Sequence, residues 1–303
     1  MADTGAKPSD PRSIAVVGGG TMGVGIAYVY AVAGCAVKLV EPNEARRTIV
    51  REILGRAAAD GLARGKLTDA QVRSVHSEIA IVASTDALAP GMDLIVETVS
   101  ENLALKQSVL SKLSGLGPRI LATNTSSISI DTLSRSAGDA SRFLGMHFFN
   151  PVWSLPFVEL VRGPRTSDEA LALARTFAEF TGKTTIVSQD VPGFATSRLD
   201  VLSAMEAIRM LEDGVASAED IDKAMVVAFR HPVGPLRLCD IVGLDVRLDI
   251  GLYLSTALGE RFAPPQLLRD KVARGELGVK SGRGFFDWSD AGYFVSQNAG
   301  KAS

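Results

Sequence analysis

Two ionisable residues stand inside apolar segments, where each needs a partner or must stay neutral. His147 lies in the segment LGMHFFNP, and Glu159 follows twelve positions later in the segment LPFVELV. A histidine can take the proton of an alcohol, and a carboxylate on its second nitrogen fixes the tautomer and stabilises the imidazolium. If the two segments form adjacent strands, the residues can meet. The sequence pattern alone does not decide whether His147 and Glu159 form a catalytic pair or a structural pair whose hydrogen bonds are satisfied in the core.

A glycine-rich turn near the N-terminus has the spacing G-x-G-x-x-G, with Gly18, Gly20 and Gly23. It follows an apolar segment, opens a helical pattern, and precedes Glu41 at the end of the next apolar segment, about twenty residues on. The glycines permit a tight turn, the approach of a pyrophosphate and close packing of helix on strand. They predict dinucleotide binding, and the charge of Glu41 favours NAD over NADP. The arginines at 46–47 either weaken that preference or form a solvated helix face.

Short apolar segments alternate with helical patterns in the N-terminal half, which is typical of parallel strands joined by crossover helices. We expect helices over residues 21–34 and 43–65. The expected strands are 13–18, 36–42, 78–84, 92–99, 119–125, 142–149 and 156–163. The predicted fold class is α/β: an N-terminal Rossmann-type, doubly wound, mostly parallel sheet with a C-terminal all-α domain.

A change in pattern marks a domain boundary near residue 190. Helical patterns dominate after the segment VSQDVPGFATSRL, and a chain of 303 residues is long for one core. We therefore predict an NAD-binding domain at 13–190 and a helical domain for substrate binding and dimerisation at 191–303. Residues 1–12 are polar, contain two prolines, and are expected to be disordered.

The composition argues against several function classes. A net charge of −2 gives no overall attraction to nucleic acid or to an anionic membrane. No apolar run approaches the roughly 20 residues of a membrane span, and the start lacks the apolar core of a secretory signal, which favours a cytoplasmic protein. Cys35 and Cys239 lie far apart and the three histidines are scattered, so we expect neither a disulfide framework nor a metal site.

Longer motifs extend over nearly the whole chain after residue 12. They are GGGTMGVGIA, VETVSEN, ATNTSSISI, GMHFFNP, VELV, DVPGF, HPVGPLRLCDIVGLD and KSGRGFFDW. With these motifs the chain resembles the L-3-hydroxyacyl-CoA dehydrogenase family, including the bacterial 3-hydroxybutyryl-CoA dehydrogenases. The most specific element is NTSS followed by the histidine of HFFNP, twenty-one residues after its first serine.

The resemblance implies roles at the matching positions. His147 matches the catalytic base, Glu159 its orienting carboxylate, and Ser126 the serine that hydrogen-bonds the substrate's 3-oxygen beside the nicotinamide. Without the family, Ser126 would be interpreted as part of a helix N-cap and Asn150 as the start of a turn. The residues implied to contact the cofactor are Gly18, Gly20, Thr21, Met22, Gly23, Glu41, Glu101, Lys106, Ser126, Asn150 and Lys280.

The implied reaction is the reversible NAD-linked oxidation of a short- or medium-chain (3S)-3-hydroxyacyl-CoA to the 3-ketoacyl-CoA, in fatty acid metabolism such as β-oxidation. The resemblance also implies a homodimer. Arginines on the helix after Glu41 would suit the phosphates of CoA, or they form a solvated basic face.

One position departs from the family pattern. The segment after PGF usually reads I-V-N-R, but here it reads A-T-S-R, which places Ser197 where an asparagine contacts the substrate. A hydroxyl cannot reproduce the contacts of an amide, so a direct contact can become water-mediated or be lost. The substrate could therefore be a small free hydroxy acid of the carnitine or gulonate type. An NAD-binding structural or sensor protein is the alternative of another class, although it would not need His147 and Glu159.

Overall fold

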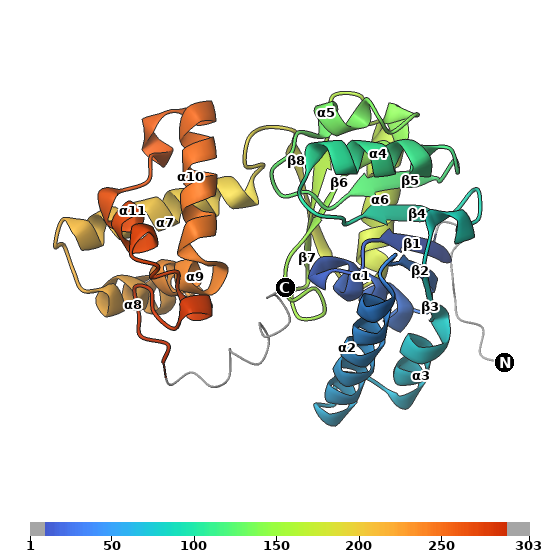
Figure 1. The fold of residues 1–303 in the computed structure, drawn as a ribbon, viewed down its shortest axis with the longest axis horizontal. Helices are drawn as coiled ribbons and strands as arrows, with labels where there is room; N and C mark the ends of the chain where they lie inside the picture. The colour runs from blue at the N-terminus through green and yellow to red at the C-terminus, as the bar shows by residue number, and fades with distance from the viewer. Residues whose placement is uncertain (1–9, 290–303) are drawn as a thin grey trace. The chain divides into compact units, whose positions relative to one another are not determined.

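The computed structural model describes residues 10–289 and divides the chain into two compact units. Unit 1 is Met1–Phe194 and unit 2 is Ala195–Ser303, so the division falls slightly beyond the predicted residue 190. Unit 1 holds the sheet and its covering helices, and unit 2 is helical (Figure 1). The predicted fold class is confirmed.

The sheet of unit 1 has eight strands in the order β3-β2-β1-β4-β5-β6-β7-β8. Neighbouring strands are parallel from β3 to β6, β7 is antiparallel to β6, and β8 is parallel to β7. Each predicted strand is present, with its ends shortened by loop residues. The strand bounds are β1 Ser13–Val17, β2 Ala36–Val40, β3 Ile79–Val82, β4 Leu94–Glu97, β5 Ile120–Thr123, β6 Phe143–Phe148, β7 Phe157–Arg162 and β8 Thr184–Gln189.

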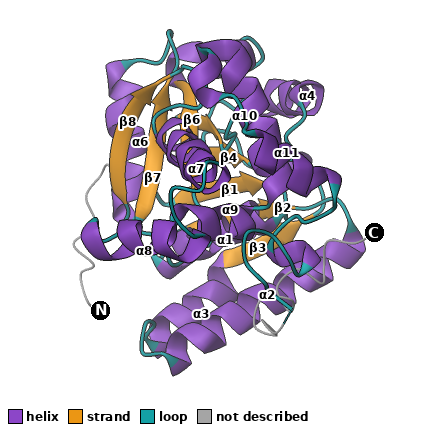
Figure 2. Ribbon diagram, turned by 90° about the vertical axis from the view of Figure 1, so that its left-hand side faces the viewer, coloured by secondary structure: helices purple, strands orange, loops and turns teal. Residues whose placement is uncertain are grey.

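Helices cover both faces of this sheet (Figure 2). Successive side chains of a strand point to opposite faces. One face packs on α1 (Thr21–Val32), α2 (Glu44–Ala63), α3 (Asp69–Glu78) and α6 (Asp168–Phe180). The other packs on α4 (Leu103–Ser114) and α5 (Ile130–Ser134). In β6, Met146 and Phe148 belong to the first core. His147 therefore faces the α4–α5 side.

Polar side chains fix where the helices of unit 1 begin. Asn43, Thr68, Asn102, Ser129 and Ser167 each accept a backbone N–H of the helix that follows, at α2, α3, α4, α5 and α6. Short 3₁₀ helices lie at Thr85–Ala87 and Ala140–Arg142. These caps set the lengths of the loops at both edges of the sheet.

Unit 2 has its own hydrophobic core. Its helices are α7 Thr196–Glu212, α8 Ala218–Ala228, α9 Pro235–Val242, α10 Leu244–Leu258 and α11 Gln266–Ala273, with 3₁₀ helices at Glu260–Phe262 and Val279–Ser281. Asp240 is buried and accepts hydrogen bonds from the backbone N–H groups of Phe285 and Phe286 and from Trp288 Nε1 (2.9, 2.9 and 2.8 Å). This carboxylate fastens the GRGFFDW segment to α9.

The predicted disordered start falls mostly outside the described part of the chain, which begins at Asp10. Within it, the backbone N–H of Arg12 donates to Asp93, and its carbonyl accepts from Ala36. Arg12 therefore departs from the expectation of disorder, because it continues the hydrogen bonding of β1. No helix within residues 10–289 is long and apolar enough to cross a membrane.

Candidate active site

The predicted site residues of unit 1 gather at one edge of the sheet. Strands β1, β2, β4, β5 and β6 run in the same direction, so their carboxyl ends meet at this edge. The glycine turn 18–23 follows β1, Glu41 follows β2, Glu101 follows β4, Ser126 follows β5 and Asn150 follows β6. Open α/β sheets bind ligands at such an edge, where the strand order reverses.

The glycine turn leaves backbone open on one side and packs tightly on the other. Gly18 has φ +119°, a conformation that favours glycine. A Cβ atom at Gly23 would lie 1.9 Å from the carbonyl oxygen of Gly18, whereas a Cβ at Gly20 would meet nothing within 4 Å. No side chain caps the first turn of α1, and it contains no acidic residue. Its N–H groups therefore remain available to an anion such as a pyrophosphate.

Glu41 is held beside this turn by backbone groups. Its carboxylate accepts the N–H of Gly19 (3.1 Å) and the N–H of Asn43 (2.8 Å). Arg46 Nε donates to the Gly19 carbonyl (3.0 Å), and Arg47 donates to the Glu41 carbonyl (3.0 Å). Both arginines are half-buried, so they belong to the loops around Glu41 rather than to a solvated helix face.

A buried ion pair between Lys106 and Glu97 lies at the carboxyl end of β4. Glu97, at the end of β4, is fully buried and accepts hydrogen bonds from Lys106 Nζ (2.9 Å) and Thr123 Oγ1 (2.8 Å). Lys106 also donates to the Val99 carbonyl and contacts the Glu101 carboxylate, both at 3.2 Å. An ammonium has three protons, and Lys106 directs them to these protein groups. Lys106 therefore positions Glu101, and its direct contact with a cofactor stays a prediction.

Glu101 in turn holds the loop that carries Ser126. One of its oxygens accepts the Thr125 hydroxyl, the Ser126 N–H (3.2 Å) and the Ser127 hydroxyl (3.0 Å). Burial raises the pKa of Glu101, but the hydrogen bonds from Thr125 and Ser127 and the charge of Lys106 outweigh it and keep the pKa below its usual range. The side chain of Ser126 is left exposed at the edge of the sheet.

The far end of this loop is fixed by Asp190. Its carboxylate accepts the Ser129 hydroxyl (2.8 Å) and the N–H groups of Ile130 (2.9 Å) and Asp131 (2.8 Å) at the start of α5. The N-cap of α5 is Ser129, so the alternative interpretation of Ser126 as part of a helix N-cap is wrong.

His147 and Glu159 lie opposite each other on antiparallel strands β6 and β7. His147 Nδ1 is 3.1 Å from Glu159 Oε2, and the two residues are 6% and 0% exposed. The predicted adjacency of the two segments is confirmed. Because the carboxylate accepts, we place a proton on Nδ1, which leaves Nε2 free to take a proton from a bound alcohol.

The loop after β6 carries Asn150, which is joined to Pro151 by a cis peptide bond. Lys183 lies beneath this loop, and its buried ammonium donates to the carbonyls of Val152 and Leu155 (2.7 Å to the latter). Burial lowers the pKa of Lys183. The lysine thereby fixes the loop that presents Asn150.

The two remaining predicted residues lie in unit 2. Lys280 forms an ion pair with Asp245, and both side chains are partly exposed. Burial raises the pKa of Asp245, but the hydrogen bond from Lys280 outweighs it and keeps that pKa low. Ser197 lies half-buried in the first turn of α7. Their parts in the site stay predictions.

Three residues that hold the loops of the site were not predicted from the sequence: Glu97, Asp190 and Lys183. A signal was available for Glu97, because it is an acid at the end of an apolar strand, and Glu41 follows such a strand. Asp190 follows the mostly polar strand TTIVSQ and gives no such signal. Lys183 follows the glycine after α6 and gives no comparable signal.

A hollow of about 340 Å³ lies in unit 1 away from these residues. Arg119 and Ile120 at the start of β5, Arg142 before β6, and Ser167 at the start of α6 line it, so it belongs to the opposite edge of the sheet. None of the predicted site residues lines it. In residues 10–289, no three His, Cys, Asp or Glu side chains form a group that could hold a metal ion.

Comparison with known families matches both parts of the chain. Residues 13–191 match the 3-hydroxyacyl-CoA dehydrogenase NAD binding domain, and residues 193–288 match the 3-hydroxyacyl-CoA dehydrogenase C-terminal domain. The chain belongs to the 3-hydroxyacyl-CoA dehydrogenase family. As a member of this family it is an NAD-dependent oxidoreductase, and the glycine turn, the uncapped first turn of α1 and Glu41 suit that cofactor.

Individual members of this family match over nearly their full length. A probable 3-hydroxybutyryl-CoA dehydrogenase of Bacillus subtilis is 38% identical over 92% of this chain and 98% of its own. A 3-hydroxybutyryl-CoA dehydrogenase of Mycobacterium tuberculosis is 39% identical over 91% and 98%. The crystal structure of the (S)-3-hydroxybutyryl-CoA dehydrogenase of Ralstonia eutropha has a TM-score of 0.87 at 37% identity, covering 92% of this chain and 100% of that one.

Proposed function

We propose that this dehydrogenase interconverts a short- or medium-chain (3S)-3-hydroxyacyl-CoA, such as 3-hydroxybutyryl-CoA, and the corresponding 3-ketoacyl-CoA. The observation that carries the proposal is the buried pair of His147 and Glu159, 3.1 Å apart at the edge where the cofactor residues gather. Relatives that share this fold over nearly their full length bear the name of the same activity.

Each residue near this pair has a chemical part. His147 takes the proton of the substrate hydroxyl through Nε2, while Glu159 stabilises the imidazolium and keeps its orientation. Ser126, whose loop is fixed by Glu101, donates to the substrate oxygen. NAD supplies the acceptor for the hydride that leaves the same carbon. In the reverse direction the imidazolium is the acid that returns the proton.

The cofactor is held at the glycine turn. The N–H groups at the start of α1 and the bare backbone at Gly20 suit its pyrophosphate, and Glu41 suits the adenosine ribose hydroxyls. We further propose that Thr21, Met22, Asn150 and Lys280 contribute contacts, as the family pattern implies.

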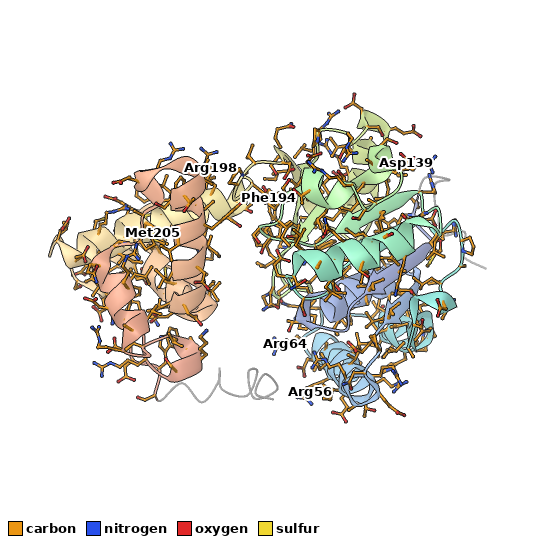
Figure 3. All side chains as sticks on the ribbon, turned by 45° about the horizontal axis from the view of Figure 1, so that its top comes forward. Arg56, Arg64, Asp139, Phe194, Arg198 and Met205 are labelled. Atoms are coloured by element: carbon orange, nitrogen blue, oxygen red, sulfur yellow. The ribbon has the colours of Figure 1, made fainter. Side chains whose placement is uncertain are left out.

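The arginine-rich helix α2 supports a CoA thioester as the substrate. Figure 3 shows Arg56 on this helix and Arg64 directly after its end; both are exposed, and neither forms a salt bridge within the described residues. Exposed guanidinium groups suit the phosphates of CoA. A free hydroxy acid would not use them.

Homodimerisation is proposed for unit 2. Unit 2 exposes large apolar side chains, among them Leu199 and Phe229 at 69% and Val227 at 63%, and a second copy of the chain could cover them. We expect a dimer in analytical ultracentrifugation and a monomer for Phe229→Glu combined with Val227→Glu. We also propose a cytoplasmic enzyme of fatty acid metabolism, such as β-oxidation, without a nucleic acid or membrane partner.

A kinetic panel tests the proposed reaction. We expect turnover with NAD on (3S)-3-hydroxybutyryl-CoA, none on the (3R) isomer, and little on carnitine or gulonate. His147→Ala should lower kcat by about 10²–10⁴-fold while NAD binding measured by calorimetry is retained. Near-normal turnover of that variant would remove His147 as the base. Faster turnover of a free hydroxy acid than of the CoA thioester would replace the proposed substrate.

Ser197 provides a second arm of the panel. Ser197→Asn restores the residue that the family usually has, and we expect it to change KM for the thioester severalfold while KM for NAD is unchanged. An unchanged KM for every substrate would show that this position does not select the substrate.

A further inference from the structure

Phe194 adopts a backbone conformation that a bulky side chain rarely takes. Its φ is +48°, and within residues 10–289 the other non-glycine residue with positive φ is Arg230. This left-handed region is unfavourable for a side chain with a Cβ atom, and such strain persists only where the surroundings fix it. Phe194 is the last residue of unit 1, and Figure 3 labels it there.

The ring of Phe194 is buried against the proposed base. Phe194 is 2% exposed, and its ring centroid lies 6.0 Å from that of His147, in an edge-on arrangement at 66°. A second ring, Phe149, lies 4.3 Å from the imidazole at 46°. Both distances are those of aromatic pairs in contact. The imidazole is therefore bounded by two rings and by Glu159.

The turn that carries Phe194 is anchored at its start and closed by a backbone hydrogen bond. Asp190 is fixed to the start of α5 by three hydrogen bonds, and the N–H of Phe194 donates to the Val191 carbonyl (2.9 Å). The Phe194 ring itself packs in the core with Ile130 and Leu133 of α5. These contacts leave the ring little freedom, so they maintain the strained φ.

We propose that Phe194 is a positioning residue for His147. Its ring restricts the imidazole to the orientation in which Nδ1 meets Glu159 and Nε2 remains free, and its left-handed backbone aims the ring there. The proposal rests on the proposed role of His147 as the base.

Substitution of the ring tests this role. Phe194→Leu keeps apolar volume without an aromatic ring, and we expect kcat to fall by about tenfold, because small misplacements of a reacting group are costly. The Kd and the KM for NAD should each change by less than about twofold. A general loss of structure would weaken NAD binding as well as lower kcat. Phe177→Leu in α6 is the matched control, because Phe177 is equally buried in unit 1 and belongs to the core on the opposite face of the sheet. Its kcat should equal that of the wild type.

Substitution of Phe194 by glycine and by alanine distinguishes the effect of the missing ring from the effect of the backbone conformation. Phe194→Gly accepts the positive φ and lacks the ring, whereas Phe194→Ala lacks the ring and keeps the strain. We expect both to lose kcat at least as far as Phe194→Leu. If Phe194→Gly keeps wild-type kcat, or if Phe194→Leu does, the ring does not position the base and the proposal is overturned.

A double-mutant cycle distinguishes this proposal from the one it rests on. In a His147→Gln background, Phe194→Leu should lower the residual turnover no further, because Phe194 acts through His147. The same tenfold loss in that background would show that Phe194 acts elsewhere, and would overturn the inference alone. Near-normal turnover of His147→Gln by itself would instead overturn the role of His147 as the base.

Discussion

The β1–α1 turn and the β6–β7 strand pair belong to one sheet, and we propose that they serve one reaction. The turn would act through its backbone, whereas the strand pair would act through its side chains. In the turn, backbone N–H groups and the absence of side chains make the site, and a Cβ atom at Gly23 would have no room. In the strand pair, the side chains of His147 and Glu159 make the site, inside a region that is otherwise apolar.

This difference predicts how each region fails. The turn loses function when a substitution adds side-chain atoms to a glycine, and we expect this loss to appear in cofactor binding or in the packing of α1. The strand pair loses function when a substitution removes the charge of a side chain or shortens it, and we expect this loss to appear in kcat. Substitutions in the two regions should therefore separate binding from chemistry.

The largest effect is expected at the carboxylate of the strand pair. Glu159→Gln keeps the shape of the side chain but removes the charge that stabilises the imidazolium and selects its tautomer. We expect kcat to fall by about 10²–10³-fold, within the range of general acid–base catalysis. The Kd for NAD should change by less than about twofold. Glu179→Gln, an exposed glutamate of the same unit, is the control. If Glu159→Gln weakened NAD binding by as large a factor as it lowered kcat, the strand pair would not act on chemistry separately from cofactor binding.

The glycines of the turn should separate packing from cofactor binding. Gly20→Ala meets no neighbouring atom, so we expect an unchanged Tm but an NAD Kd raised at least about tenfold. Gly23→Ala places a Cβ 1.9 Å from the Gly18 carbonyl, so the helix must shift at a cost of about 3 kcal/mol or more, which lowers Tm by roughly 6 °C or more.

Gly115→Ala is the control for these two variants. A Cβ at this helix end would lie 3.5 Å from the Lys112 carbonyl, in ordinary contact. Calorimetry and thermal unfolding measure all three variants. If Gly20→Ala binds NAD as the wild type does, the bare backbone at this position is not where the cofactor approaches.

A smaller effect is expected at Glu41, where the turn does rely on one side chain. Glu41→Ala removes the charge that opposes a 2′-phosphate and leaves Arg46 and Arg47 in place beside it. We expect the ratio of kcat/KM for NAD to that for NADP to fall by about tenfold, the value of one charged hydrogen bond. The neighbouring exposed acid provides the control as Glu44→Ala. A ratio that stays at the wild-type value would dismiss Glu41 as the ribose ligand.

The sequence predicted those parts that depend on local pattern. Alternation and the period of the apolar residues located the strands, and the glycine spacing located the turn, because both reflect backbone geometry. The partnership of His147 with Glu159 was accessible because two adjacent strands bring neighbours in sequence together.

Contacts between distant segments were beyond that reasoning. Asp190 reaches the start of α5 from about sixty positions away, and Glu101 accepts the N–H of Ser126 from 25 positions away. The positive φ of Phe194 follows from those tertiary anchors rather than from local propensity, since phenylalanine disfavours it. Such features emerge only when the whole unit is packed.

The smallest expected effect concerns Glu101, which holds the Ser126 loop after β5, a strand that lies between the two regions in the sheet. Glu101 has a lowered pKa, so its stabilisation is present above the ordinary value of about 4.3 and is lost as the pH falls through the lower folded value. The side chain of Glu101 is 39% exposed, and screening by solvent therefore limits its contribution to the free energy of unfolding to roughly 1 kcal/mol. Glu101→Gln should therefore lower Tm by about 2–4 °C at pH 7 and by less at pH 3. Glu52→Gln on α2 controls for the loss of one exposed carboxylate. An equal difference in Tm at both pH values would show that Glu101 holds the Ser126 loop by shape rather than by charge.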